Sequence, residues 1–151
     1  MTYSYDLVIR GGTVATAAET VFCDIGIRDG VIVALGSDLG NAKEVLDASG
    51  RLVLPGGVDA HCHVDQVSST GLITAADFYS GGVSAACGGT TTIVPFAAQH
   101  RGNSLVQVVR DYEAKAAPKA FVDYAFHLIV SDPTPTVLSE ELPQLIHEGH
   151  P

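Results

Sequence analysis

The stretch LVLPGGVDAHCHVD, residues 52–65, decides how the rest of the chain is interpreted. Two histidines in it, His61 and His63, are separated by a single residue and follow a short apolar run. On a β-strand, residues two apart project to the same side, so both imidazoles can reach one divalent ion such as Zn²⁺. We therefore take His61 and His63 as candidate metal ligands. Two surface histidines at a strand end are the alternative interpretation.

The residues before this stretch have the pattern of a small antiparallel sheet. Apolar and less apolar residues alternate over 21–28, as they do in a half-buried strand. Asp29 and Gly30 separate this run from the apolar residues 31–35. An Asp-Gly pair between two such runs is typical of a tight hairpin, because Gly accepts the positive φ that the turn requires. We expect residues 1–52 to form an antiparallel sheet.

After Pro55 the pattern changes to strands that alternate with helices. The strand at 90–96 is β-branched without alternation, as expected for a parallel strand buried on both faces. Ser104 and Ser139 are candidate N-caps of the second and third helices. We expect strands near 57–63, 90–97 and 121–130, with helices near 75–87, 104–117 and 139–149.

Repeated strand–helix units indicate a parallel sheet, either open or closed into a barrel. Three units do not close a barrel, so we interpret the chain as the N-terminal part of a longer protein. A complete three-stranded α/β domain is the alternative.

The composition excludes several classes of protein. Hydrophobic residues make up 46% and charged residues 17%, which excludes a disordered chain. The net charge of −9 disfavours binding to nucleic acid or to an anionic membrane surface. There is no apolar run of the roughly 18 residues that span a bilayer, and the N-terminus lacks the features of a secretory signal. Three widely spaced cysteines are expected to be free thiols in the cytoplasm.

Three further residues in the opening stretch are candidates for lesser roles. The histidine pair lies at the carboxyl end of the first parallel strand, where α/β proteins place their active sites. Asp59 could brace an imidazole from behind, and Asp65 could orient a ligand or hold a loop. Cys62 has the opposite strand parity, so we expect it to pack away from the histidines.

The remaining histidines are weaker candidates. His127 lies within an apolar run and is expected to be a core histidine with satisfied hydrogen bonds. His100 follows a strand in a loop, and His147 and His150 end the last helix, where solvated side chains are expected.

At this point the sequence resembles a known family. The β-rich start, the run VLPGGVDAHCHVD and the later ACGGTTT are similar to the metal-dependent amidohydrolases, and within them to hydantoinases and dihydropyrimidinases. This resemblance covers the whole chain in order. It implies an α/β fold in which a small antiparallel β-sandwich domain precedes a (β/α)₈ TIM barrel. Residues 1–52 would be the N-terminal portion of the sandwich, and 53–151 the first three βα units.

The resemblance also implies a metal site. Two divalent ions, usually zinc, would be bridged by a carboxylated lysine and a hydroxide, with His61 and His63 as the first-strand ligands. The lysine of the fourth strand, two further histidines and the catalytic aspartate of the eighth strand would all lie beyond Pro151. No catalytic residue is therefore expected within this chain, which alone is expected to be inactive.

Residues 65–71 help to choose between relatives. Dihydroorotases resemble H-x-H-x-R here, and their arginine receives a substrate carboxylate that Asp65 would repel. Allantoinases often have asparagine at this place. Family members often continue with MPFGG, whereas this chain has QVSSTG at 66–71. Because this loop helps to form the substrate pocket, Gln66 and Val67 are candidate pocket residues.

The activity that this resemblance implies is hydrolysis of a cyclic amide or imide ring, of the hydantoin or dihydropyrimidine type, by metal-activated hydroxide. We expect a small-molecule substrate and a homo-oligomer, either a dimer or a homotetramer. The alternatives are a non-catalytic scaffold protein of the same fold, an allantoinase-type amidohydrolase and a free-standing metal-binding module.

Overall fold

A computed structural model describes residues 3–68 and 70–150 of the chain, so Met1, Thr2, Ser69 and Pro151 lie outside the described residues. Contacts between Cα atoms divide the chain into two compact units, Met1–Pro55 and Gly56–Pro151. The sequence predicts this boundary after residue 52, and the structure includes the short strand Leu52–Val53 in the first unit.

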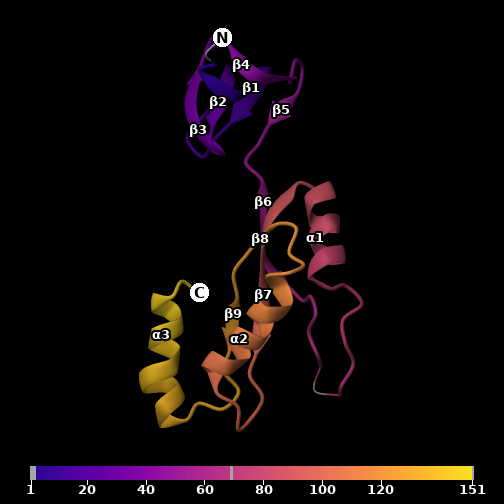
Figure 1. Ribbon diagram of the computed structural model, residues 1–151, viewed down its shortest axis with the longest axis vertical. Coiled ribbons are helices and arrows are strands. Elements are labelled where there is room, and N and C mark those ends of the chain that lie inside the picture. The colour runs from indigo at the N-terminus through magenta and orange to yellow at the C-terminus, as the bar shows by residue number, and fades with distance from the viewer. Residues whose placement is uncertain (1–2, 69, 151) are drawn as a thin grey trace. The chain divides into compact units, whose positions relative to one another are not determined.

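The first unit is a five-stranded sheet with the order β3-β2-β1-β4, in which β5 also pairs with β1 (Figure 1). Its strands are β1 (Tyr5–Ala15), β2 (Thr20–Arg28), β3 (Val31–Gly36), β4 (Ala42–Asp47) and β5 (Leu52–Val53). β1 and β3 each run antiparallel to β2, whereas β4 and β5 run parallel to β1. The prediction of a wholly antiparallel sheet is therefore wrong. Alternation of apolar residues reports which face of a strand is buried, and says nothing of the direction of the neighbouring strand.

The hairpin between β2 and β3 is confirmed. Asp29 and Gly30 both have positive φ, 51° and 75°, as a tight two-residue turn requires. Val14, Cys23 and Ile25 form the small core of this sheet.

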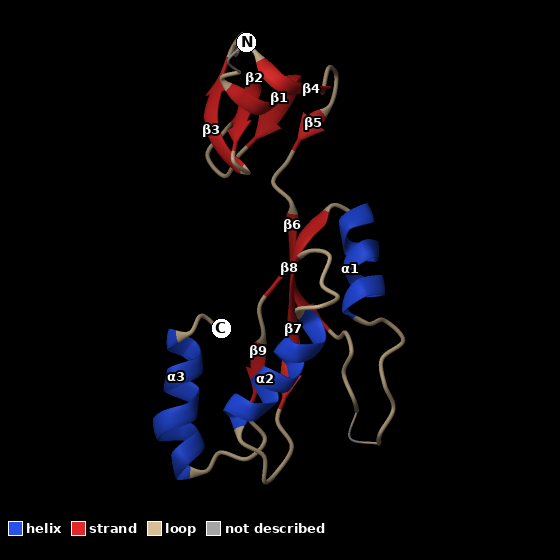
Figure 2. Ribbon diagram, in the orientation of Figure 1, coloured by secondary structure: helices blue, strands red, loops and turns tan. Residues whose placement is uncertain are grey.

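The second unit alternates strands and helices around the central strand β7 (Figure 2). Its elements are β6 (Gly57–Cys62), α1 (Phe78–Cys87), β7 (Thr90–Ala98), α2 (Leu105–Ala116), β8 (Asp123–Tyr124), β9 (His127–Ile129), η1 (Val137–Glu141) and α3 (Leu142–His147). β6, β8 and β9 all run parallel to β7, which confirms the predicted parallel strands. The third predicted strand is divided into the two short strands β8 and β9.

The first two helices begin close to where the sequence predicts. Asp77 caps α1 in a capping box with Ser80, and Ser104 caps α2 by accepting a hydrogen bond from the backbone N–H of Gln107. α2 buries one face, formed by Leu105, Val108, Val109, Tyr112 and Ala116. These side chains join Phe78, Ile93 and Phe126 in the core of the unit.

The helical segment that contains α3 begins with η1 at Val137, before the predicted cap Ser139. Ser139 is not its N-cap, because it lies inside the π-helical turn η1 and donates its hydroxyl to the carbonyl of Pro135 at 2.8 Å. Pro143 offers no N–H to close an α-helical turn onto Ser139, and the wider π turn precedes it. Gly149, with φ 99°, ends the helix as predicted. Within residues 3–68 and 70–150, no helix is long and apolar enough to span a membrane.

Candidate metal centre

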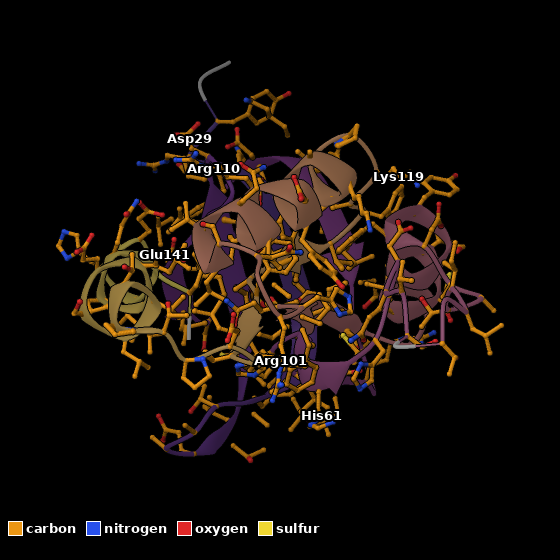
Figure 3. All side chains as sticks on the ribbon, turned by 90° about the horizontal axis from the view of Figure 1, so that it is seen from below. Asp29, His61, Arg101, Arg110, Lys119 and Glu141 are labelled. Carbon is orange, nitrogen blue, oxygen red and sulfur yellow. The ribbon has the colours of Figure 1, made fainter. Side chains whose placement is uncertain are left out.

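His61 and His63 lie on the same side of β6, at its carboxyl end. Their ring centroids are 5.6 Å apart, and both rings contact Phe96 of β7, at 4.8 Å and 5.1 Å. Both histidines are exposed. In Figure 3, His61 lies on the opposite side of the strands from α2. The prediction from strand parity, that the two imidazoles face the same way, is confirmed.

Phe96 and His127 extend this face across the next two strands. They are paired in register between β7 and β9, and their ring centroids are 5.3 Å apart. The Nε2 atom of His127 lies 3.1 Å from the carbonyl oxygen of Ala60, which can only accept, so Nε2 carries the proton. The sequence predicts a core histidine here, whereas the structure places a half-buried His127 beside the pair. Parity along neighbouring parallel strands is the signal that could have found both residues.

Asp59 does not share the side of the histidines. Asp59 is paired with Ile93, and Cys62 is paired with Pro95. Between these two pairs β6 contains one residue more than β7, which is a β-bulge. This bulge resets the alternation and turns Asp59 toward the side of Cys62, where both line a hollow beside α1 of about 550 Å³. Simple strand alternation would have put Asp59 on the side of the histidines. Its Oδ1 still accepts the backbone N–H of His61, at 3.1 Å.

Cys62 faces away from the two histidines. Its side chain packs against the core cluster of the unit, as the sequence predicts. Burial, and secondarily the nearby Asp59 carboxylate, raise the pKa of the thiol. A protonated thiol is a poor metal ligand, so these surroundings favour a packing role.

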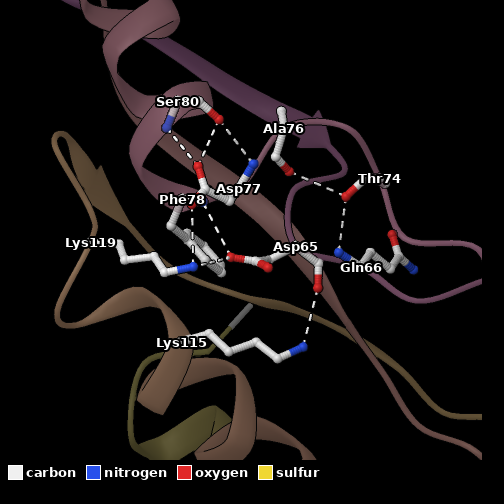
Figure 4. A network of polar contacts seen from close by, with 9 residues as sticks. All are labelled: Asp65, Gln66, Thr74, Ala76, Asp77, Phe78, Ser80, Lys115 and Lys119. Atoms are coloured by element: carbon white, nitrogen blue, oxygen red, sulfur yellow. Dashed lines mark hydrogen bonds and ion pairs between the residues drawn. The ribbon is translucent and has the colours of Figure 1, made fainter.

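Asp65 points toward the helices (Figure 4). Its Oδ2 accepts from the backbone N–H of Phe78 and lies 3.4 Å from Nζ of Lys119, and its carbonyl accepts from Lys115 at 3.2 Å. Of the two roles considered for Asp65, the contacts are those of a residue that holds a loop. A φ of 49°, which aspartate tolerates better than most residues, makes this turn possible.

Lys119 joins the same cluster to the start of α1. Its Nζ lies 3.2 Å from Oδ2 of Asp77. Hydrogen bonds from the side chain and backbone of Ser80, followed by that from Lys119, lower the pKa of Asp77 to about 2. The Asp77 carboxylate is therefore charged at neutral pH, and in this form it caps α1.

Gln66 and Val67 lie in a loop that folds back on itself like a small hairpin. Val67 forms an isolated bridge with Ile73, and Ser68 N donates to the carbonyl of Leu72 at 2.8 Å. Gln66 and His63 help to line a hollow of about 440 Å³, together with Ser68, Thr70, Leu72, Ile73 and Thr74. Val67 lines a different hollow, toward α2. Of the two candidate pocket residues, the structure brings Gln66 and not Val67 to His63.

His61 and His63 can supply two of the ligands of a metal site. Two exposed imidazoles on one side of a strand are suitable ligands for Zn²⁺ or a similar ion. In the part of the chain that the structure describes, no group of three or more histidine, cysteine, aspartate or glutamate side chains could hold a metal. A complete site therefore needs further donors in addition to His61 and His63.

Comparisons with known proteins give the family of the chain. The amidohydrolase family matches residues 44–129. A D-hydantoinase from Ralstonia pickettii is 46% identical over 135 residues, 89% of this chain and 29% of that protein. A D-hydantoinase from Geobacillus stearothermophilus is 43% identical over 142 residues, 93% of this chain and 30% of that protein.

A solved structure shows the same likeness. The dihydropyrimidinase from Brevibacillus agri NCHU1002 superposes with a TM-score of 0.88 at 43% identity, over 95% of this chain and 31% of that one. The predicted resemblance to hydantoinases and dihydropyrimidinases is confirmed. The chain spans about three tenths of the length of the curated relatives that it matches.

Proposed function

Because the chain belongs to the amidohydrolase family, we propose that it is part of a metal-dependent hydrolase that opens cyclic amide or imide rings. The substrate class is that of hydantoins and dihydropyrimidines, after which the matched relatives are named. The observation that carries the proposal is the His61–His63 pair, which the structure sets on one side at the carboxyl end of a parallel strand.

We further propose the place of the two units in such an enzyme. The first unit supplies the N-terminal portion of a β-sandwich, and the second supplies the first three βα units of a (β/α)₈ barrel. The parallel pairing of β6, β8 and β9 with β7, and the helices α1 and α2 between them, support this placement. The bridging carboxylated lysine, the other histidines and the catalytic aspartate would come from later strands.

A pair of divalent ions, which we propose to be zinc, would make water nucleophilic at neutral pH and polarise the attacked carbonyl. This chain's part is to hold the ions and shape the site. His61 and His63 donate one nitrogen each, and Phe96 supports both rings from the next strand. Asp59 fixes the backbone at His61 through its hydrogen bond to that residue's N–H.

The loop after His63 contributes to substrate selection. Asp65 is directed to Lys119 and to the start of α1, so it does not offer its charge to the substrate. Leu72 and Ile73 are 73% and 67% exposed and line the hollow beside His63. An apolar substituent on the ring is therefore favoured on this side.

The proposal is tested in the natural full-length protein by replacing each histidine with alanine. His61→Ala and His63→Ala should each lower the metal content, measured by elemental analysis, and nearly abolish ring opening. His147→Ala is the matched control, because His147 is exposed at the end of α3. Full metal content and activity in both site variants would exclude the assignment.

The choice of substrate separates the remaining alternatives. Hydantoin and dihydrouracil should be opened faster than allantoin. A preference for allantoin would instead show an allantoinase. Metal-free protein without any ring-opening activity would show a scaffold.

A further inference from the structure

We propose that Gln66 is a positioning residue for His63. It holds the imidazole in the tautomer with hydrogen on Nδ1, which leaves the lone pair on Nε2, the nitrogen that would bind the metal. This inference rests on the proposed function, because it assumes that His63 is a ligand.

The placement of the Gln66 amide oxygen points to one tautomer. Nδ1 of His63 lies 2.5 Å from Oε1 of Gln66, a short hydrogen bond. An amide oxygen carries no hydrogen, so the ring nitrogen must be the donor. In a neutral imidazole the other nitrogen then holds the lone pair, which is the form that binds a metal. A hydrogen bond to the second ring nitrogen also makes the ligating nitrogen more basic.

Thr74 bonds both the N–H and the carbonyl of Gln66, and Figure 4 shows the first of these bonds. Gln66 N donates to Oγ1 of Thr74 at 3.1 Å, and Thr74 N donates to the carbonyl of Gln66 at 3.0 Å. The hydroxyl of Thr74 in turn donates to the carbonyl of Ala76 at 3.3 Å. These bonds fix the point from which the Gln66 side chain reaches His63.

The preceding residue ties the same loop to the helices. Asp65 N donates to the carbonyl of Ala76 at 3.0 Å, and its carboxylate contacts Lys119 and the backbone of Phe78. The acceptor of Gln66 is therefore presented by a preorganised loop. Preorganisation matters here because a ligand that must first be oriented binds its metal less tightly.

Phe96 and Gln66 orient His63 in different ways. The Phe96 ring is nearly parallel to the imidazole, with an interplanar angle of 19°, and so limits the tilt of the plane. Stacking cannot choose between the two tautomers, because it does not involve a ring N–H. The hydrogen bond to Gln66 makes that choice.

The test compares Gln66→Met with Gln66→Glu in the natural full-length protein. Methionine has a similar length but only a weak acceptor, whereas glutamate keeps a strong acceptor in the same place. The measurement is the zinc dissociation constant, obtained by adding zinc to metal-free protein in competition with a chromophoric chelator. Gln144→Met is the matched control, because Gln144 is exposed on α3 and its side chain bonds Glu148, one turn along the same helix.

Gln66→Met should weaken zinc binding by about 10- to 100-fold, the usual loss when the partner of a ligating histidine is removed. Gln66→Glu should bind zinc at least as tightly as the natural protein, with the same stoichiometry, and Gln144→Met should not change. Natural affinity in Gln66→Met would overturn the inference. So would equal weakening in Gln66→Met and Gln66→Glu, which would indicate that the residue only supports the fold.

His63→Ala separates this inference from the proposed function. If His63→Ala loses zinc while Gln66→Met binds it normally, the metal site stands and only the role of Gln66 fails. If His63→Ala retains its zinc, His63 is not a ligand and both fail.

Discussion

Cys62 lies between the two candidate ligands in sequence but has different chemical surroundings. The thiolate is the reactive form of cysteine, and burial raises the pKa of this thiol. We therefore expect iodoacetamide to modify Cys62 more slowly than the exposed Cys87 at pH 7. Mass spectrometry of peptides after timed labelling measures both rates in one sample. Equal rates would show that Cys62 faces solvent.

Replacing the thiol provides a second test of which way Cys62 faces. Cys62→Ala should leave the metal content unchanged and lower the free energy of unfolding by about 1 kcal/mol, as modest core truncations do. Elemental analysis and denaturant unfolding of the full-length variant check the two parts. Loss of metal in Cys62→Ala would mean that the sides of β6 have been assigned the wrong way round.

Single residues show how far the site could be predicted from sequence. His61 and His63 are two apart, and a strand keeps its parity over so short a distance. Asp59 is separated from them by a bulge, which nothing in the local sequence indicates. Gln66 contacts His63 because the loop after His63 folds back on itself. Hydrogen bonds within the loop, such as that between Gln66 and Thr74, set this fold, and the alternation of apolar and polar residues does not predict them.

At the scale of elements, α1 contains a glycine that alanine cannot replace without cost. A Cβ at Gly82 would lie 3.1 Å from Cβ and 3.2 Å from N of Phe121. Alanine normally stabilises a helix interior by about 1 kcal/mol relative to glycine. Here we expect Gly82→Ala to destabilise the protein by about 1–3 kcal/mol, because the backbone of Phe121 must move.

Thermal or denaturant unfolding of Gly82→Ala checks this sign. Ser84→Ala on the exposed side of the same helix is the control, and it should be nearly neutral. A gain of stability in Gly82→Ala would show that α1 and the segment at Phe121 are less closely packed than described.

The cap of α1 should respond to acid. Folding lowers the pKa of Asp77 from its ordinary value of 3.8 to about 2, chiefly through Ser80 and then Lys119. A lowered pKa stabilises the fold above the ordinary value, and this stabilisation is lost as pH falls through the folded value. The stability difference between the natural protein and Asp77→Asn should therefore shrink between pH 4 and about 2.

Thermal midpoints of both proteins across that pH range measure this difference. Asp123→Asn, at an exposed position in β8, is the control for the general effect of removing a carboxylate. A difference that stays constant down to pH 2 would contradict the role of the charged cap.

The sequence predicts which segments form strands and helices better than it predicts the direction of neighbouring strands or the residues at which elements begin and end. Apolar runs and caps locate β7 and α2, because these signals lie within the elements themselves. The parallel pairing of β4 with β1 depends on where the chain returns after β3, which is a tertiary choice. The start of the third helix depends on Pro143, whose missing donor is visible in the sequence but whose effect on the preceding turn is not.

At the scale of the whole molecule, the second unit has two different faces. One side of its strands packs against α1 and α2 around Phe78, Ile93 and Leu105. The other carries His61, His63 and Phe96, and β6 is exposed over most of its length. The proposed barrel explains both faces, because later strands would pair with the edge of β6 and enclose the side that bears the histidines.

The last prediction follows from the apolar surface of the 151-residue chain. Large side chains are more than half exposed in both units, on β3 and β4 in the first and on β6 and the following loop in the second: Val31, Ile32, Leu35, Val45, Leu46, Val58, Leu72 and Ile73. Apolar surface of this kind normally marks an interface, and open strand edges promote association.

Expressed alone, the chain should therefore associate and bind a dye such as ANS. Co-expression with the remainder of the natural protein should reduce both effects, since later strands would cover these faces. Light scattering and dye fluorescence measure the two properties. A dye-free monomer that unfolds in one sharp transition would mean that these 151 residues fold as a complete domain, and the proposal of a partial barrel would then be withdrawn.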